Sequence, residues 1–307
     1  MNDSQAISYR FKAMGGPCEV RLYGVTPLEA SSIAAAVEGE VRRLELRYSR
    51  YRDDSITAQI NGTATTGQPL PVDPETAALL NYAHTAWVQS DGLFDITSGV
   101  LRKLWNFKEH KLPSQAEIDG VLPLIGWQKI VWRNSCIVLP EPGMEIDFGG
   151  YVKEYATDRA AATARDHGAR HGFVDLAGDI AVIGPHPDRT PLAIGIRNPV
   201  QPDVAIASVP MSYGAIASSG SYERFFEHEG RRYCHILNPV TGWPVADEVS
   251  SVSVIADACL IAGTATTIAM LKGLVEGTKW LDSLGLPYVL VDSAGVVRVG
   301  EVKQDEI

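Results

Sequence analysis

Cysteine is scarce in this 307-residue chain and is never clustered. The four cysteines, Cys18, Cys136, Cys234 and Cys259, are widely spaced, and no two of them form a Cys-x-x-Cys pair. Proteins held together by disulfides carry dense, regularly spaced cysteines, which this sequence does not. The pattern therefore favours free thiols in a reducing compartment.

The sequence also lacks a run of basic residues. It has 27 Lys and Arg against 37 Asp and Glu, and its formal net charge is -10. Because nucleic-acid binding depends on clustered positive charge, we expect no nucleic-acid partner. An anionic ligand such as a dinucleotide would need a local group of cations and backbone N–H donors within this acidic surface.

Long hydrophobic runs and a leader-like beginning are missing as well. Residues 1–5 show neither the basic start nor the apolar stretch of a signal peptide. No run approaches the roughly 18 apolar residues of a membrane span. We therefore expect a cytoplasmic protein with no membrane partner.

No internal repeat, linker or low-complexity tract divides the chain. With 45% hydrophobic and 21% charged residues, it has the composition of an ordinary globular protein with a large core. We expect a single domain over residues 1–307, built as two closely packed lobes.

The most informative stretch begins at Ser218-Ser219-Gly220, where small residues let the backbone approach a ligand closely. Two strand-like runs then flank Glu229-Gly230, which predicts a hairpin. His235 follows, and the steps Asn238-Pro239 and Thr241-Gly242 predict a rigid turn that fixes its position. By itself this pattern fits a structural histidine at a sheet edge as well as a functional one.

The rest of the chain alternates helices and strands. Apolar spacing predicts helices over 27–48, 74–90, 114–124, 262–271 and 280–284. A pair of strands is expected over 7–23 and a hairpin over 287–302. Single strands are expected over 129–139, 145–147, 192–197, 205–217 and 252–256, and a strand broken at 178–179 is expected over 173–184. Asn61-Gly62 is predicted to be a turn. The strand that ends at Asp147 leads through Gly149-Gly150 into a helix, whose free N–H groups and positive end suit a phosphate.

Together these segments resemble the ApbE family of FAD:protein FMN transferases. Residues 218–242 are similar to the family pattern [ST]-S-G-x-Y-x-R-x-F followed by G-x-x-Y-x-H-I-L-x-P-x-T-G. Residues 92–107 resemble G-x-F-D-x-T-x-G and L-W-x-F, and the segment from Asp147 to Asp158 resembles D-L-x-x-x-G-[KE]-G-Y-A-x-D. The resemblance extends from Met14 to Thr267. It implies an α+β fold of the ApbE type, T-fold-like, with mixed or antiparallel sheets flanked by helices.

The resemblance also implies an activity and its partners. In this family FAD is split at its pyrophosphate, the FMN half is esterified onto a threonine or serine of a client flavoprotein, AMP leaves, and magnesium assists. We therefore expect FAD and a client flavoprotein with an acceptor Thr or Ser as partners.

The residues that match the family's motifs imply a site. Its cofactor-binding residues would be Met14, Tyr51, Asn61, Leu93, Phe94, Asp95, Asp147, Lys153 and Ile236. The Gly150 carbonyl and Thr267 would hold the metal, and His235 and Asp179 would be catalytic. His235 is the best candidate for proton handling or phosphate contact because an unperturbed histidine titrates near neutrality, at about 6.5. Asp179 and Asp147 stay open as alternative bases.

Four positions depart from the family's pattern, the first being Gly16, which stands where a threonine is usual. The other three lie in the segments expected to hold the phosphate and the metal. Gly263 stands where the metal-binding aspartate is usual, and Val152 and Glu154 stand where glycines are usual. Because magnesium normally has one or two carboxylates among its oxygen ligands, Gly263 weakens the expected site. Two alternatives therefore stay open: a non-catalytic FAD-binding protein, and an FAD pyrophosphatase that releases AMP and FMN.

Overall fold

The computed structural model describes residues 6–201 and 204–300. Residues 1–5, on which the expectation about a signal peptide rests, lie outside this range. So do residues 301–302, the last two of the predicted C-terminal hairpin.

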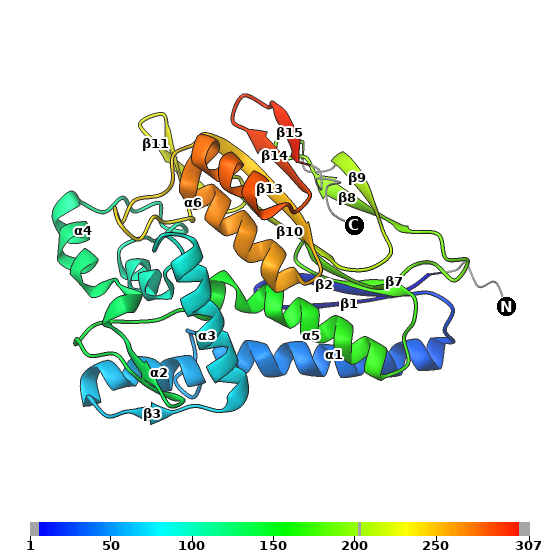
Figure 1. Cartoon of the computed structure of the whole chain (residues 1–307), viewed down its shortest axis with the longest axis horizontal. Helices are drawn as coiled ribbons and strands as arrows, with labels where there is room; N and C mark the ends of the chain where they lie inside the picture. Colours follow the sequence, from blue (N-terminus) through cyan, green and yellow to red (C-terminus); the bar gives the residue numbers. More distant parts are fainter. Residues whose placement is uncertain (1–5, 202–203, 301–307) are drawn as a thin grey trace.

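An eight-stranded antiparallel sheet forms the centre of the fold (Figure 1). Its strands lie in the order β1-β2-β6-β7-β10-β13-β14-β15, and every neighbouring pair is antiparallel. The bounds are β1 Ile7–Ala13, β2 Gly16–Leu22, β6 Gly172–Leu176, β7 Asp179–Gly184, β10 Ala215–Gly220, β13 Val249–Ala256, β14 Tyr288–Asp292 and β15 Val297–Gly300.

Three helices cover one face of this sheet. They are α1 (Pro27–Tyr48), α5 (Val152–Asp166) and α6 (Cys259–Leu284), and α5 packs between the other two (Figure 1). Side chains alternate between the two faces of a strand, and Val174 and Val254 are among those that point into the core beneath the helices. This layer places the first turns of α5 beside α6.

The opposite face of the sheet is covered by a two-stranded ribbon. Strands β8 (Leu192–Arg197) and β9 (Ala205–Met211) pair with each other and pack Ile194 against Val182 and Ile216. Both faces of the large sheet are therefore buried against apolar side chains. This agrees with the nearly continuous hydrophobic sequence of its central strands, since a strand buried on both faces does not alternate between apolar and polar residues.

The remaining elements gather at one end of the helical layer. They are α2 (Ile56–Thr66), α3 (Pro74–Gln89), α4 (Gln115–Val121), the 3-10 helices η1 (Ile96–Lys103), η2 (Leu122–Leu124), η3 (Trp127–Lys129) and η4 (Phe148–Gly150), the small sheet of β3 (Leu70–Pro71), β4 (Val131–Arg133) and β5 (Cys136–Val138), and the hairpin of β11 (Phe225–His228) and β12 (Arg231–Cys234). Trp105, Phe226 and Tyr233 share a separate apolar cluster here. The Trp105 indole N–H donates to the Gly242 carbonyl at 2.9 Å and so ties the segment after the hairpin to this region.

Most predicted elements are present, and the antiparallel α+β architecture is confirmed. Two of the longer predicted strand segments each contain two strands, and in the first of them the predicted break at 178–179 lies one residue beyond the turn that the structure shows. Residues 173–184 form the hairpin β6–β7, because Ala177 (φ 55°) and Gly178 (φ 96°) make a tight turn. Residues 205–217 divide between β9 and β10.

Four further differences concern shorter segments. Residues 129–139 contain the pair β4–β5 instead of one strand, and residues 145–147 form no strand. Asn61-Gly62 is not a turn, because it lies inside α2. The two helices predicted over 262–271 and 280–284 belong to one element, α6, with a break at Gly273 (φ 77°).

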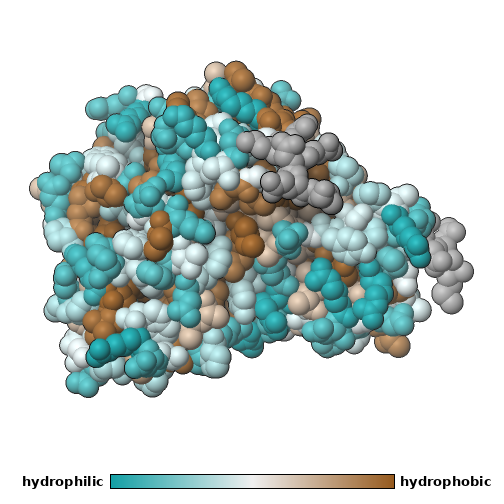
Figure 2. Space-filling model, in the orientation of Figure 1, coloured by the Kyte–Doolittle hydropathy of each residue, from teal (hydrophilic) through white to brown (hydrophobic). Residues whose placement is uncertain are grey.

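Within the described part of the chain, one helix, α6, is long and apolar enough to span a membrane by length and composition alone. The expectation that no segment approaches a membrane span is therefore corrected. Half of the apolar window of α6 is buried, and the helix packs against β10 and β13 of the central sheet. On the face shown in Figure 2, hydrophobic residues form separate patches among hydrophilic ones. The helix has the packing of a core element.

Candidate active site

An ion pair between Lys153 and Asp179 lies where α5 meets the start of β7. The Lys153 ammonium contacts Asp179 Oδ2, and the Asp179 side chain is only 2% exposed. Asp179 Oδ1 also accepts a hydrogen bond from the Ser218 backbone N–H at 3.3 Å. Burial alone would lower the pKa of Lys153, but the carboxylates of Asp179 and Glu154 more than offset it, and the pKa lies above its usual range. Two of the predicted site residues, Lys153 and Asp179, are thus brought together.

Glu154 lies next to this pair and is almost fully buried, with 8% of its surface exposed. Its Oε1 is 4.0 Å from the Lys153 ammonium, and its Oε2 has no hydrogen-bond partner in the described structure. Burial raises the pKa of Glu154 to about 8; Lys153 opposes this rise and Asp179 adds to it. A carboxyl group left without a partner in the protein interior is costly, so Glu154 is an unusual residue to find here.

Helix α6 brings hydroxyl groups to the same junction. The Ser219 hydroxyl on β10 lies 2.8 Å from the Thr266 hydroxyl and 3.3 Å from the Thr267 hydroxyl. The first turn of α6 is held by Asp158 of α5, which accepts from the backbone N–H groups of Cys259 (2.7 Å) and Leu260 (2.9 Å). Since α5 fixes the start of α6 in this way, the position of Thr267 relative to α5 is set by direct contacts.

Asp147 precedes the phosphate-binding turn predicted at Gly149-Gly150. Its Oδ1 accepts from the Gly149 N–H at 2.9 Å, which begins η4, and its Oδ2 is paired with the guanidinium of Arg50. The Arg50 guanidinium also donates to the Tyr51 hydroxyl at 2.8 Å and lies over the Tyr51 ring. Arg50 therefore connects Tyr51, which is 79% exposed, to Asp147. Arg50 was not among the predicted site residues, although it directly precedes Tyr51 in the sequence.

Asn61 holds the segment before Asp147 in place. Its amide accepts from the Ile146 N–H at 2.8 Å and donates to the Ile146 carbonyl at 3.2 Å. A two-point bond of this kind fixes a backbone unit in the way a neighbouring strand would. Asn61 was predicted to bind the cofactor; in this structure its amide holds the chain beside Asp147.

Leu93, Phe94 and Asp95 lie between α3 and η1. Phe94 is buried and packs edge-on against Tyr151, with ring centroids 6.0 Å apart. Asp95 Oδ1 accepts from the Thr97 N–H (2.9 Å) and hydroxyl (2.6 Å), and Oδ2 accepts from the Trp127 N–H (2.8 Å). The Asp95 carboxylate is therefore engaged within the protein, where it caps η1 and holds η3. Its predicted contact with the cofactor stays a prediction.

Met14 lies in the turn between β1 and β2. It has a positive φ of 51°, and its backbone N–H donates to Glu45 Oε1 at 2.6 Å. Its half-buried side chain packs against the main core. This turn therefore lies beside α1, the helix that carries Glu45.

His235 directly follows β12, where its backbone N–H donates to the Arg224 carbonyl at 3.0 Å. Its ring Nδ1 is buried and has no hydrogen-bond partner among the residues that the structure describes. Burial, aided by the positive charge of Arg224, lowers the pKa of His235 to about 4, so the ring is neutral at pH 7. The next residue, Ile236, accepts a backbone hydrogen bond from Val245 at 3.0 Å, which fixes the loop that carries the motif.

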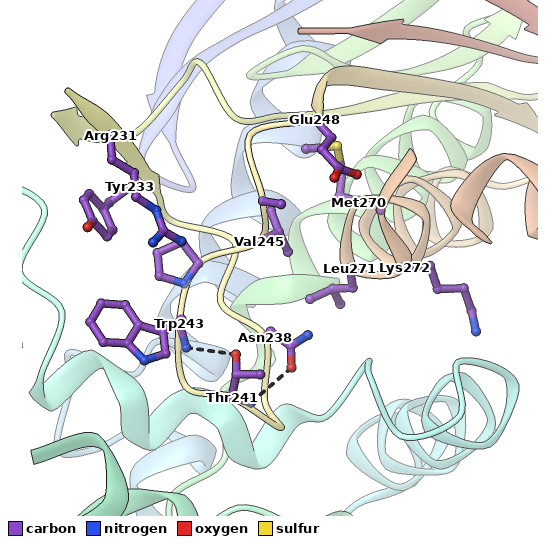
Figure 3. Close-up of a pocket in the computed structure, with 13 residues that line it drawn as sticks. Arg231, Tyr233, Asn238, Thr241, Trp243, Val245, Glu248, Met270, Leu271 and Lys272 are labelled. Carbon is purple, nitrogen blue, oxygen red and sulfur yellow. Dashed lines mark hydrogen bonds between the residues drawn. The ribbon is translucent and has the colours of Figure 1, made fainter. Parts of the chain in front are cut away.

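A cavity of about 570 Å³ lies beside this loop (Figure 3). It is bounded by Asn238 and Thr241 of the turn after His235, by Tyr233 and Trp243, and by residues 270–273 of α6. None of the predicted site residues lines it. The side-chain cluster around Lys153 and Asp179 is the better candidate for phosphate chemistry, because it combines a buried ion pair with a buried carboxyl oxygen that has no partner.

No group of three or more His, Cys, Asp and Glu side chains gathers as a metal cage in residues 6–201 and 204–300. The oxygen donors at the junction are instead the carboxyl groups of Asp179 and Glu154 and the hydroxyls of Ser219 and Thr267. Such a set suits magnesium, which keeps several waters and takes few protein ligands. The residues present therefore fit such an ion. The predicted metal residues Gly150 and Thr267 lie on η4 and α6, on either side of α5 in the chain.

Known structures share this fold. The ApbE protein from Thermotoga maritima superposes with a TM-score of 0.89 at 30% identity, covering 97% of both chains. The flavinyl transferase ApbE from Pseudomonas stutzeri, in its apo form, gives a TM-score of 0.83 at 25% identity, covering 97% of this chain and 95% of the other. These similarities define the class: a flavin transferase fold.

Sequence relatives agree with the structures. An FAD:protein FMN transferase of Klebsiella pneumoniae (strain 342) is 30% identical over 282 residues, covering 90% of this chain and 86% of the relative. One from Treponema pallidum (strain Nichols) is 30% identical over 292 residues, covering 84% and 79%. Residues 14–290 match the ApbE family, and the chain belongs to that family. The predicted family and enzyme class, a transferase, are confirmed.

Proposed function

We propose that this protein transfers FMN from FAD to a hydroxyl group of a client flavoprotein. The observation that carries the proposal is the ApbE family match over residues 14–290, with FAD:protein FMN transferases 30% identical across most of both chains. In this reaction the acceptor hydroxyl oxygen forms a bond to the phosphorus of the FMN half. The bond from that phosphorus to the AMP oxygen breaks, AMP leaves, and a base takes the hydroxyl proton.

Lys153 is the residue we propose for the diphosphate. Its ammonium is paired with Asp179, so an incoming diphosphate would meet a cation already held at the first turn of α5. The backbone N–H groups of this first turn and of Gly149-Gly150 add partial positive charge. Together they supply the local cationic group that an acidic protein needs for an anionic ligand.

His235 is the proton acceptor that the contacts favour over the two aspartates. Asp179 is paired with Lys153, and Asp147 is paired with Arg50, so both carboxylates are already engaged. His235 is neutral and keeps an unpartnered ring nitrogen. An anionic diphosphate nearby would raise its pKa from about 4 toward neutrality and make it a stronger base.

We propose magnesium as the assisting ion. When bound, it neutralises charge on the diphosphate as the bond to AMP breaks. The Gly150 carbonyl and the Thr267 hydroxyl are the ligands that the family resemblance assigns. Position 263, where a carboxylate is usual, is glycine in this chain.

Because Gly263 removes the usual metal-binding carboxylate, the experiment also has to distinguish transfer from two alternatives, FAD binding alone and FAD hydrolysis. A protein without a working metal site would bind FAD and stop there, and a protein without an acceptor site would hydrolyse FAD to FMN and AMP. Incubation with FAD, magnesium and a flavoprotein bearing an acceptor threonine separates the three. Transfer gives a fluorescent band on a denaturing gel, hydrolysis gives AMP and free FMN without a band, and binding alone gives neither product.

We also propose a cytoplasmic location. The supporting observation is that all four cysteines are free thiols in the structure. Fractionation of the native host, with detection by an antibody to this chain, tests it.

A further inference from the structure

The side chain of Glu154 occupies the space beside Gly263, across the contact between α5 and α6. A Cβ atom added to Gly263 would lie 2.3 Å from Glu154 Cγ, 3.0 Å from Cδ and 3.1 Å from Oε1. Two positions that depart from the family's pattern are therefore in direct contact. The carboxyl group that α6 lacks at position 263 is present at the same place, but it comes from α5.

The Glu154 carboxyl group is not satisfied by the protein. Its Oε2 has no hydrogen-bond partner within the described residues, and the residue is 8% exposed, so water does not solvate it freely. Lys153 is the nearest cation at 4.0 Å from Oε1, and its ammonium is already bound to Asp179. Leaving a carboxylate oxygen unpartnered in the interior is costly, which points to a missing positive partner.

The surroundings supply oxygen ligands. Thr267 lies one helical turn beyond Gly263 on the same face of α6. The Ser219 hydroxyl is 3.3 Å from the Thr267 hydroxyl. Asp179 contributes a second carboxylate, because the Lys153 ammonium lies against the carboxyl groups of both Asp179 and Glu154. A small divalent cation bound by one or two carboxylates, a hydroxyl, water and substrate phosphates needs no larger cage of acidic residues.

We propose that Glu154 supplies from α5 the metal-binding carboxylate that position 263 of α6 lacks, for an oxygen-ligated divalent cation such as magnesium. This inference rests on the proposed function. In this chain the carboxylate is on α5 instead of α6, and Gly263 leaves the space that the Glu154 side chain occupies.

The direct test measures metal binding without the client protein. Mn²⁺ is the probe, and its free fraction is read from its electron paramagnetic resonance signal, with ADP present to supply a diphosphate that cannot be transferred. Glu154→Gln keeps the shape of the side chain and removes its charge, and we expect it to bind Mn²⁺ at least about 10-fold more weakly, a loss of about 1.4 kcal/mol. Glu276→Gln removes an exposed carboxylate elsewhere on α6 and should bind as the wild type does.

A second variant returns the carboxylate to α6. The double variant Glu154→Gly with Gly263→Asp should recover most of the affinity lost in Glu154→Gln. The inference is contradicted if the wild type binds no Mn²⁺, if Glu154→Gln binds it as the wild type does, or if a double variant with a wild-type melting temperature binds it no better than Glu154→Gln.

The outcome is independent of the transfer assay. If the wild type flavinylates a client but Glu154→Gln keeps full Mn²⁺ affinity, the proposed function stands and the inference fails. If the wild type transfers no FMN but Glu154→Gln loses Mn²⁺, the inference stands and the proposed function fails.

Discussion

Glu154 Cγ lies where a side chain at position 263 would begin: a Cβ built on Gly263 is 2.3 Å from it. Atoms at that distance overlap, so a larger residue at 263 has to displace Glu154 or push α5 and α6 apart. Gly263 is buried within α6, where neither movement is easy.

The first prediction concerns Gly263→Ala. In a helix interior this change is ordinarily stabilising by about 1 kcal/mol. Here we expect it to destabilise the protein by about 1–3 kcal/mol through overpacking. Urea denaturation gives the free energy of unfolding. Combining Gly263→Ala with Glu154→Ala should remove most of the penalty, because the two residues are in contact. Equal penalties with and without Glu154 would show that no clash exists.

The second prediction concerns the ion pair of Lys153 and Asp179. Lys153→Met leaves the buried Asp179 carboxylate without its cation, and we expect a loss of about 1–3 kcal/mol in stability and weaker binding of FAD. Adding Asp179→Asn to Lys153→Met removes the unpaired charge and should restore much of the stability but not the FAD affinity. Thermal unfolding and flavin fluorescence titration measure the two effects separately. Recovery of both by the double variant would argue against a phosphate contact for Lys153.

The third prediction is a pH dependence from His235. Burial and Arg224 lower its pKa to about 4 from the ordinary 6.5, so between these values the unfolded chain binds a proton that the folded chain does not. Stability therefore falls as pH drops from 6.5 to 4, and above pH 6.5 this contribution is fully present. Urea unfolding of the wild type and His235→Gln across pH 4–8 tests this, because the variant lacks the titrating ring. Identical slopes for the two proteins would contradict a buried neutral histidine.

The fourth prediction separates binding from positioning at Asn61. Both ends of its amide are bonded to Ile146, next to Asp147. Asn61→Ala should cost about 1–3 kcal/mol in stability because it leaves a backbone N–H and carbonyl unpaired. Asn61→Asp keeps the bond to the Ile146 N–H and should cost less. FAD affinity should fall in step with stability across the two variants. A large loss of affinity in a variant of unchanged stability would instead mean that Asn61 contacts the cofactor.

Much of the architecture follows from local sequence signals. The hairpin β11–β12 was predicted from Glu229-Gly230, and both residues have the positive φ that such a turn needs, 49° and 74°. The break in 173–184 was predicted at Gly178-Asp179, one residue beyond the actual turn at Ala177-Gly178, because Ala177 was not recognised as a residue that takes a positive φ. Asn61-Gly62 misled in the opposite direction: the pair is typical of turns, but Ser55 caps a helix that runs through it.

The site was predictable in its residue types and less so in its contacts. The motifs identified Lys153, Asp179 and His235, and the structure shows the first two paired and the third with a free ring nitrogen. The resemblance to the family also showed that Glu154 and Gly263 are unusual at their positions. It gave no sign that they touch, because that contact depends on how α5 packs against α6, which is a property of the tertiary structure.

The central claim is that this chain moves FMN from FAD onto a protein. The most direct measurement incubates it with FAD, magnesium and a flavoprotein that has an acceptor threonine, and follows both covalent flavin fluorescence on a denaturing gel and released AMP. We expect a fluorescent client band and one AMP for each flavin attached, with neither formed by His235→Ala. Free AMP and FMN with an unlabelled client, or bound FAD that stays intact, would contradict it.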